Sequence, residues 1–166
     1  VAADRRWQTV LAVAPDAAVS SRAWPRGVVR TAQGGGDLGR RMQRIFDRQP
    51  PGPVIIVGTD IPAITTARIA AAFRMLRGAT AVLGAAPDGG YWLVGLCRAS
   101  RIERPFNNVR WSSRWALADT VRNLGHRRIA AAAELGDVDD AESYAGCRAW
   151  FGRNVLPVVI TTEKIT

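Results

Sequence analysis

The stretch VIIVGTDIPAIT, residues 54–65, decides the class of the fold. Four apolar residues run without polar alternation into Gly58, Thr59 and Asp60, and Pro62 then interrupts strand pairing. Such a run is typical of a strand that is buried on both faces of a mostly parallel sheet. Ligands of these sheets bind beyond the carboxyl ends of the strands, so we expect Asp60 to lie where a ligand binds.

Strand and helix signals alternate along the rest of the chain, which favours an α/β domain. Apolar runs predict strands over residues 7–14, 27–31, 54–58, 80–86, 91–96 and, with a loop, 127–139. Helical spacing of apolar residues predicts helices over residues 38–49, 66–76, 111–125 and 140–152. We expect Asp37, Thr65 or Thr66, and a serine to cap the first three helices. Residues 153–166 are expected as a tail or an edge strand.

Length and composition describe one globular domain of 166 residues, of which 48% are apolar and 22% charged. Scattered arginines carry the net charge of +9, Lys164 is the only lysine, and no basic stripe with interleaved aromatic residues is present. We therefore do not expect a nucleic-acid partner, whereas an anionic small molecule suits the charge. Cys97 and Cys147 stand far apart and no apolar run is long enough to span a membrane, so a cytoplasmic protein is expected.

Carboxylates follow two of the predicted strands. Asp60 ends the stretch quoted above, and Asp139 belongs to an acidic cluster, DVDD, that precedes a predicted helix. One or two carboxylates, together with substrate phosphates, are the usual ligands of Mg²⁺ or Mn²⁺. Capping of the following helices explains the same positions, so both interpretations stay open.

Three further stretches are candidates for ligand contacts. QGGGDLGRRM, residues 33–42, brings flexible backbone to a helix N-terminus, a geometry that binds anions, although the ending of a P-loop is absent. PDGG, residues 87–90, is either a hairpin turn or a close backbone approach, and the following Tyr91 and Trp92 are either core or ligand contacts. WSS, residues 111–113, is either a helix start or a wall of a sugar or base pocket.

Taken in order, these stretches resemble the GT-A-fold, nucleotide-diphospho-sugar-transferase-like family, often described as glycosyltransferases of arsenosugar biosynthesis. The resemblance covers residues 7–149 and rests on five motifs: QGGGDLGRRM, VIIVGTDIPAIT, AVLGAAPDGGYWLVGL, FNNVRWSSRWALADTVRNL and LGDVDDAESY. It implies an α/β, Rossmann-like three-layer sandwich with a mostly parallel sheet and a nucleotide at the carboxyl ends of the strands. The same superfamily includes molybdenum-cofactor and 2-phospholactate guanylyltransferases.

The resemblance also implies roles for individual residues. It gives Asp60 the part of the metal-binding aspartate, and Asp139 that of a second ligand of Mg²⁺ or Mn²⁺. The nucleotide is expected against Gln33, Gly36, Asp37, Leu38 and Gly39. The acceptor is expected against Gly89, Gly90, Tyr91, Trp111 and Ser112, with Asp88 as the catalytic base or as a ligand of the acceptor.

The implied function is a metal-assisted glycosyltransferase that uses a nucleotide sugar and an unidentified hydroxyl acceptor. A nucleotidyltransferase that releases pyrophosphate is the nearest alternative, because the same site serves both reactions. The expected partners are small molecules, and the sequence leaves a homo-oligomer open.

One departure from the family concerns the start of the chain. The family opens with a strand and a glycine- and basic-rich loop that grips phosphates, and nothing similar precedes Trp7. We therefore expect a single domain over residues 1–166 that is N-terminally incomplete, with an exposed apolar strand edge and weakened nucleotide binding. A catalytically inactive binding or assembly module is the third alternative.

Overall fold

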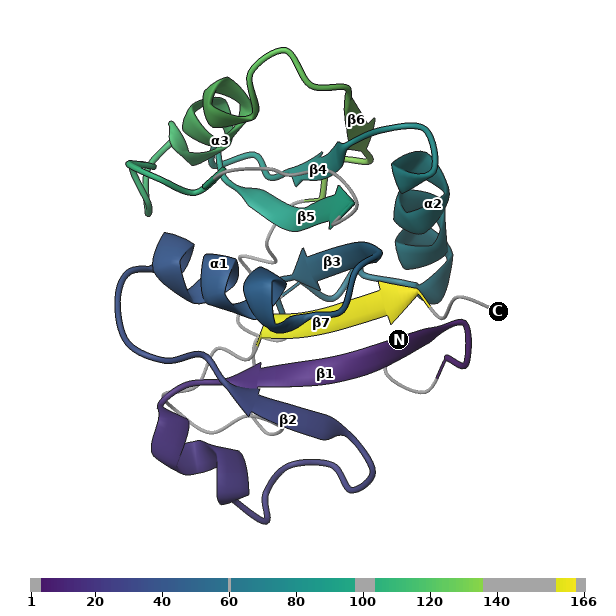
Figure 1. The fold of residues 1–166 in the computed structure, drawn as a ribbon, viewed down its shortest axis with the longest axis vertical. Helices are drawn as coiled ribbons and strands as arrows, with labels where there is room; N and C mark the ends of the chain where they lie inside the picture. Colours follow the sequence, from purple (N-terminus) through teal and green to yellow (C-terminus); the bar gives the residue numbers. More distant parts are fainter. Residues whose placement is uncertain (1–3, 60, 98–103, 136–157, 164–166) are drawn as a thin grey trace.

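The computed structural model describes residues 4–59, 61–97, 104–135 and 158–163, and these residues form one mixed sheet with helices around it (Figure 1). The seven strands lie in the order β2-β1-β7-β3-β5-β4-β6. Their bounds are Trp7–Val13 (β1), Val29–Ala32 (β2), Pro53–Val57 (β3), Ala81–Ala85 (β4), Tyr91–Cys97 (β5), Ile129–Ala132 (β6) and Val158–Glu163 (β7). β5 and β7 run opposite to the other five strands, so most strands share one direction.

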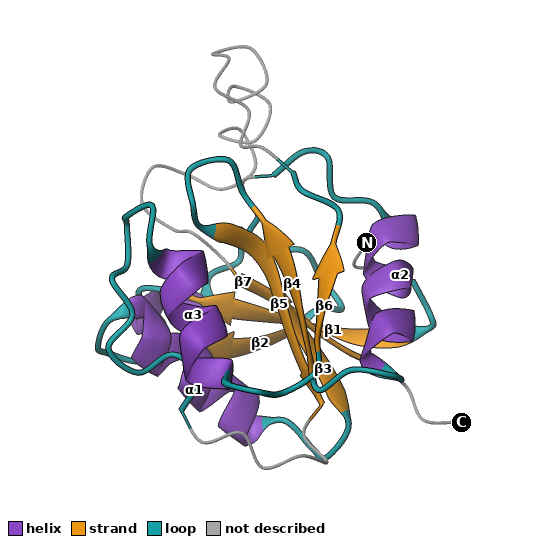
Figure 2. Cartoon of the chain, turned by 90° about the horizontal axis from the view of Figure 1, so that it is seen from above, coloured by secondary structure: helices purple, strands orange, loops and turns teal. Residues whose placement is uncertain are grey.

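The helices form the two outer layers of the predicted three-layer α/β sandwich. They are α1 (Leu38–Arg48), α2 (Thr66–Leu76) and α3 (Ala116–Leu124), with a short 3-10 helix, η1, at Asp16–Ser20. Figure 2 shows α1 and α3 on one face of the sheet and α2 on the other. No helix in the described part of the chain combines the length and the apolar character that crossing a membrane requires.

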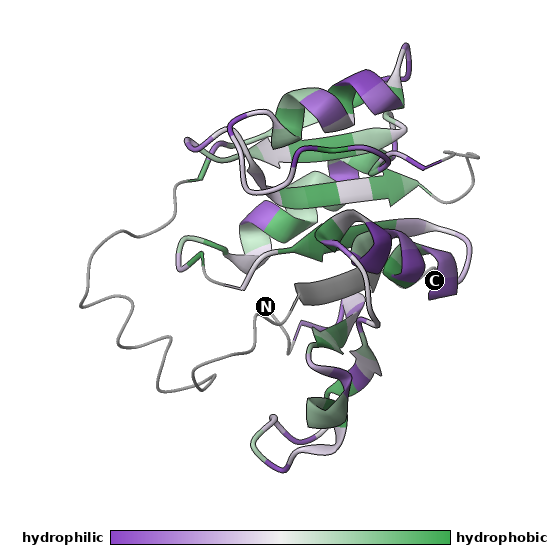
Figure 3. Ribbon diagram, turned by 90° about the vertical axis from the view of Figure 1, so that its left-hand side faces the viewer, coloured by the Kyte–Doolittle hydropathy of each residue, from purple (hydrophilic) through white to green (hydrophobic). Residues whose placement is uncertain are grey.

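β3 is buried on both faces, as residues 54–65 predict. Val54 and Ile56 join the apolar cluster on the side of α1, whereas Ile55 and Val57 join the cluster that includes Phe73 of α2. Figure 3 shows the strands mostly in green, while the helices alternate between purple and green turns. The sheet therefore supplies both halves of the core, and each helix buries one face against it.

Local capping signals begin two helices where the sequence predicts. The Asp37 carboxylate accepts the N–H of Arg40 at 2.8 Å at the start of α1, and the Thr65 hydroxyl accepts the N–H of Arg68 at 3.3 Å at the start of α2. The predicted serine cap of α3 is wrong, because α3 begins only at Ala116 and its N-cap makes no side-chain hydrogen bond.

The C-terminal strand is the main difference from the sequence prediction. β7 pairs antiparallel with β1 on one side and with β3 on the other, so residues 158–163 form an interior strand rather than an edge strand or a tail. The expected exposed strand edge is wrong for the same reason, since β1 and β3 are each paired on both sides. The edges are the four-residue strands β2 and β6, which offer little backbone for pairing with another chain. The predicted helix over 140–152 lies outside the described residues.

The interior position of β7 predicts that a proline there destabilises the fold. Thr161 lies in register with Thr9 on β1 and with Ile55 on β3. Thr161→Pro removes a backbone donor from a strand with neighbours on both sides, and we expect a loss of about 2 kcal/mol or more in unfolding free energy. Urea denaturation measures this loss. Thr161→Ala is the control because it keeps the backbone donor, and equal stability of the two variants would contradict the interior position.

Candidate functional site

A cavity of about 230 Å³ opens at the carboxyl end of β3. Gly58, the first residue after this strand, donates its N–H to the carbonyl of Trp92 on β5 at 3.0 Å. Gly58 and Ile61, which lie on either side of Asp60 in the sequence, both line the cavity. The end of the strand thus borders a hollow at the edge of the sheet where ligands of α/β proteins bind.

The turn between β4 and β5 forms another wall of the cavity. The Asp88 carboxylate accepts the N–H of Gly90 at 2.8 Å, and the Gly89 carbonyl accepts the N–H of Leu117 at 3.0 Å. This second bond satisfies one of the amides that the start of α3 leaves without an intrahelical partner. Gly89 has a φ of +84°, and a Cβ there would lie 2.5 Å from the Cα of Arg114. The predicted PDGG stretch is therefore both a hairpin turn and a close backbone approach.

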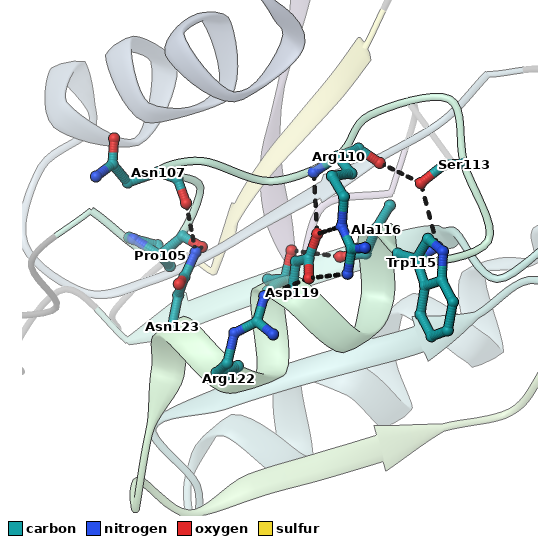
Figure 4. Close-up of polar contacts among 10 residues, drawn as sticks. Pro105, Asn107, Arg110, Ser113, Trp115, Ala116, Asp119, Arg122 and Asn123 are labelled. Atoms are coloured by element: carbon teal, nitrogen blue, oxygen red, sulfur yellow. Dashed lines mark hydrogen bonds and ion pairs between the residues drawn. The ribbon is translucent and has the colours of Figure 1, made fainter.

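A buried carboxylate holds the segment that precedes α3 (Figure 4). Asp119 is 1% exposed and accepts three bonds from Arg110, from its backbone N at 3.1 Å, Nε at 2.8 Å and Nη2 at 2.8 Å. Arg122 pairs with the same carboxylate. The hydrogen bonds from Arg110 hold the pKa of the Asp119 carboxyl well below its ordinary value of 3.8. Because Arg110 is fixed in this way, the adjacent Trp111 and Ser112 are held against the cavity.

The first turns of α1 close the cavity on a further side. Leu38 and Met42 line it, and Leu38 remains 42% exposed. Gly39 packs against the neighbouring segment, since a Cβ there would lie 2.7 Å from the carbonyl oxygen of Phe106 and 2.9 Å from the indole of Trp111. Because Gly39 has no side chain, α1 can lie directly on the segment before α3 that Asp119 fixes.

Tyr91 and Trp111 are two half-buried rings that form an aromatic wall of the cavity. Their ring centroids lie 6.3 Å apart at an interplanar angle of 72°. The Tyr91 hydroxyl donates to the Thr120 hydroxyl at 3.3 Å, because Thr120 itself donates to a main-chain carbonyl. Burial raises the pKa of Tyr91 above its ordinary value of 10.0, so this side chain is a neutral wall. Trp92 is a core residue that is 2% exposed and donates its indole N–H to a main-chain carbonyl at 3.0 Å.

The structure brings together about half of the residues that the sequence predicts for ligand binding. The predicted residues that line the cavity are Leu38, Asp88, Gly90, Tyr91, Trp111 and Ser112. The predicted residues outside its lining are Gln33, Gly36, Asp37, Gly39 and Gly89. Among these, Gln33 is 3% exposed and its side-chain amide donates to the carbonyl of Ala12 at 3.0 Å.

Four residues of the cavity and its support were not predicted as site residues: Met42, Ile61, Ala116 and Asp119. The three apolar residues belong to patterns that also describe a core, so the sequence offers no signal for them. Asp119 carried one usable signal, an acidic residue among the alanines and threonine of a predicted apolar helix face.

The predicted metal ligands Asp60 and Asp139 lie outside the described residues. Within the described ranges, no three His, Cys, Asp or Glu side chains are grouped so that they could hold a metal ion. Asp88 is the acidic residue in the described lining of the cavity, and one of its oxygens is occupied by the Gly90 amide.

Comparison with known proteins places the chain in a family. The sequence model of the family described as "Uncharacterized protein conserved in bacteria (DUF2064)" matches residues 1–113, which include α1, β3 and the turn between β4 and β5. The chain belongs to this family. No curated protein matches it.

A solved structure is similar to this DUF2064 chain over much of its length. It is the crystal structure of a putative nucleotide-diphospho-sugar transferase from Desulfovibrio desulfuricans G20, with 31% sequence identity and a TM-score of 0.60. The match covers 68% of this chain and 51% of that protein, so the chain spans about half the length of the relative. The predicted fold of the nucleotide-diphospho-sugar-transferase type is thereby confirmed.

The contact of the Gly89 turn with α3 predicts two costs for a side chain at this position. Gly89→Ala must accommodate both a positive φ and the Arg114 backbone, and we expect a loss of about 3 kcal/mol in unfolding free energy. Gly27→Ala is the matched control, because Gly27 has a φ of +79° and nothing within 4 Å of a Cβ. It should lose about 1 kcal/mol from strain alone. Urea denaturation measures the unfolding free energy of both variants. Equal losses would show that the contact with the Arg114 backbone does not contribute to the destabilisation.

The buried Asp119 carboxylate predicts a pH dependence of stability. Its pKa is lowered in the folded state, so its stabilisation is present above pH 3.8 and is lost as the pH falls below that value. Asp119→Asn should be less stable than the wild type at pH 7, and this difference should shrink towards pH 3. Thermal melting across pH 3–7 measures both proteins. A difference that stays constant over this range would contradict the ion pair as the source of the stabilisation.

Proposed function

We propose that the chain carries the site of a glycosyltransferase that uses a nucleotide-diphospho-sugar donor and a hydroxyl acceptor. The cavity at the carboxyl end of β3, bordered by one carboxylate and an aromatic wall, is the observation that supports this proposal most directly. The similarity to a solved protein described as a putative nucleotide-diphospho-sugar transferase supports the same class of reaction.

The donor side is assigned to the loop before α1. Gly36 has a φ of +104°, and Asp37 and Leu38 carry the chain into the helix, where Leu38 borders the cavity. The backbone N–H groups at a helix N-terminus favour the binding of an anionic group, such as the diphosphate of the donor. A divalent cation held by Asp60, and by Asp139 as a second ligand, would neutralise the charge that develops on the departing diphosphate.

The acceptor side is assigned to the turn and to the aromatic wall. Asp88 holds the Gly90 amide through Oδ1, which leaves Oδ2 for an acceptor hydroxyl in the same cavity. The acceptor oxygen forms the new bond to the anomeric carbon while the bond from that carbon to the diphosphate breaks. The hydroxyl proton passes to Asp88, and the nucleoside diphosphate leaves with the bonding electrons. The indole ring of Trp111 would contact the sugar through its edge or its face.

The charge of the cavity lining bears on which substrate group the cavity holds. The described residues that line it include Asp88 but no arginine, lysine or histidine. Such a lining suits a neutral, hydroxyl-bearing acceptor. The diphosphate of a nucleotide sugar and the triphosphate of a nucleotide both need cationic partners, so the choice between sugar transfer and nucleotidyl transfer rests on the assay below. A cytoplasmic location remains a prediction from the composition.

The test is to incubate the protein with Mn²⁺ and a panel of uridine, guanosine and thymidine diphosphosugars, and to follow nucleoside diphosphate release by mass spectrometry. Release that depends on added hydroxyl compounds is the expected result. Pyrophosphate release from nucleoside triphosphates under the same conditions would instead identify a nucleotidyltransferase. If neither assay detects a product and no ligand causes a thermal shift, the result would support a catalytically inactive binding or assembly module.

The assigned roles predict different defects for two aspartates. Asp88→Asn should reduce transfer about 10²- to 10⁴-fold, because it removes the proton acceptor, while the thermal shift caused by the donor stays unchanged. Asp60→Asn should lose the Mn²⁺-dependent part of that thermal shift. Asp4→Asn is the control, since Asp4 pairs with Arg6 in the described N-terminal region away from the cavity. Full transfer by Asp88→Asn would remove Asp88 from the mechanism.

A further inference from the structure

A second hollow lies on another side of α1 and has the opposite charge. It is an open groove of about 560 Å³ between α1 and the segment 104–107. Gly39 and Phe106 line this groove and not the cavity described above. Their close contact with Trp111 separates the two hollows. The groove is therefore a distinct feature, and an inference about it does not rest on the proposed function.

Four arginines line the groove. Arg40, Arg44 and Arg48 recur every four residues along one face of α1, and Arg104 lies across from them. Asp47 is the acidic residue of the lining and accepts the side-chain amide of Gln43 at 3.0 Å. Four arginines and one aspartate leave three positive charges in excess.

Two of these arginines are fixed by the protein itself. Arg44 donates to the carbonyls of Gln33 at 2.5 Å and Gly35 at 3.0 Å, and Arg48 donates to the carbonyl of Ala32 at 3.0 Å. Each guanidinium keeps further N–H groups, because it carries five donors. Side chains held in place in advance lose little freedom when they bind a ligand.

The other two arginines keep their full set of donors within the described residues. Neither the Arg40 nor the Arg104 side chain has a hydrogen bond or an ion pair to any residue in the ranges that the structure describes. The groove thus presents fixed and unpaired guanidiniums together. Planar guanidinium groups match phosphate oxygens in geometry and charge.

We propose that this groove binds an oligophosphate group, such as the diphosphate of a small molecule. The excess of three positive charges matches a diphosphate in magnitude, and the volume is ample for it. Single-stranded nucleic acid fits less well, because it needs aromatic faces for base stacking. The aromatic residue of the groove, Phe106, is 5% exposed and stacks on Phe46 at a centroid distance of 5.8 Å.

Calorimetry with inorganic pyrophosphate in EDTA tests the proposal without any metal-dependent binding. The wild type should bind with a dissociation constant below about 1 mM. Arg40→Gln/Arg104→Gln should weaken binding at least about tenfold, because it removes two charged donors. The matched control is Arg68→Gln/Arg74→Gln, which removes the same charge from α2 on the opposite face of the sheet (Figure 2).

Thermal melts of both double variants check that they are folded. Weakened binding in the groove variant alone supports the proposal. Equal weakening in both variants would show that only net charge matters, and unchanged binding in the groove variant would place the anion elsewhere. No binding by the wild type, or tighter binding of a single-stranded oligonucleotide than of pyrophosphate, would also overturn the proposal.

Discussion

The buried carboxylate of Asp119 is the interaction on which the candidate site depends. It binds Arg110 through the backbone and both sides of the guanidinium fork, and it pairs with Arg122 as well. A buried carboxylate without such partners would destabilise the fold. Detachment of the segment before α3 would remove the partner groups of Arg110 and leave the Asp119 carboxylate in that unfavourable state. Trp111 on this segment touches Gly39 of α1, and the turn at Gly89 bonds to α3. The ion pair thus fixes the segment before α3 on α3, and the contact with Gly39 and the bond from Gly89 place α1 and the β4–β5 turn around the same cavity.

The position of α1 gives the molecule two hollows of different chemistry. Leu38 and Met42 face an apolar cavity with one carboxylate, whereas Arg40 and Arg44 face a groove rich in guanidinium groups. Helical geometry alone separates these residues, because neighbours in sequence point about 100° apart around the axis. The same helix therefore borders two hollows whose described linings differ in charge.

Local signals predicted more of the fold than non-local ones did. Asp37 and Thr65 cap their helices as expected, since a capping side chain needs only the amide two or three residues further on. The interior strand β7 was not predicted, because pairing with β1 and β3 involves residues about a hundred or more positions away and leaves no trace in the pattern of 158–163 itself. Similarly, the role of Asp119 follows from its contact with Arg110, which no spacing rule on a helix describes.

For the candidate site, the motifs indicated the edge of the sheet at which the cavity lies but not every residue of its lining. Asp88, Gly90 and Trp111 come together as expected, whereas Gln33 bonds to the carbonyl of Ala12. A glycine-rich motif shows that backbone approaches another group closely, yet it does not show which group. At Gly89 that group is the backbone of Arg114, and at Gly39 it is the Phe106 carbonyl.

The claim that the cavity at the end of β3 is the ligand site can be tested most directly by nuclear magnetic resonance. Amide and indole N–H signals are recorded while a nucleotide-diphospho-sugar is added with Mg²⁺, using uridine, guanosine and thymidine donors in turn. We expect shifts at Gly58, Gly90 and the Trp111 indole for the donor that binds, with no shifts along α2. Saturable shifts confined to α2, or to other residues outside the cavity, would contradict the claim.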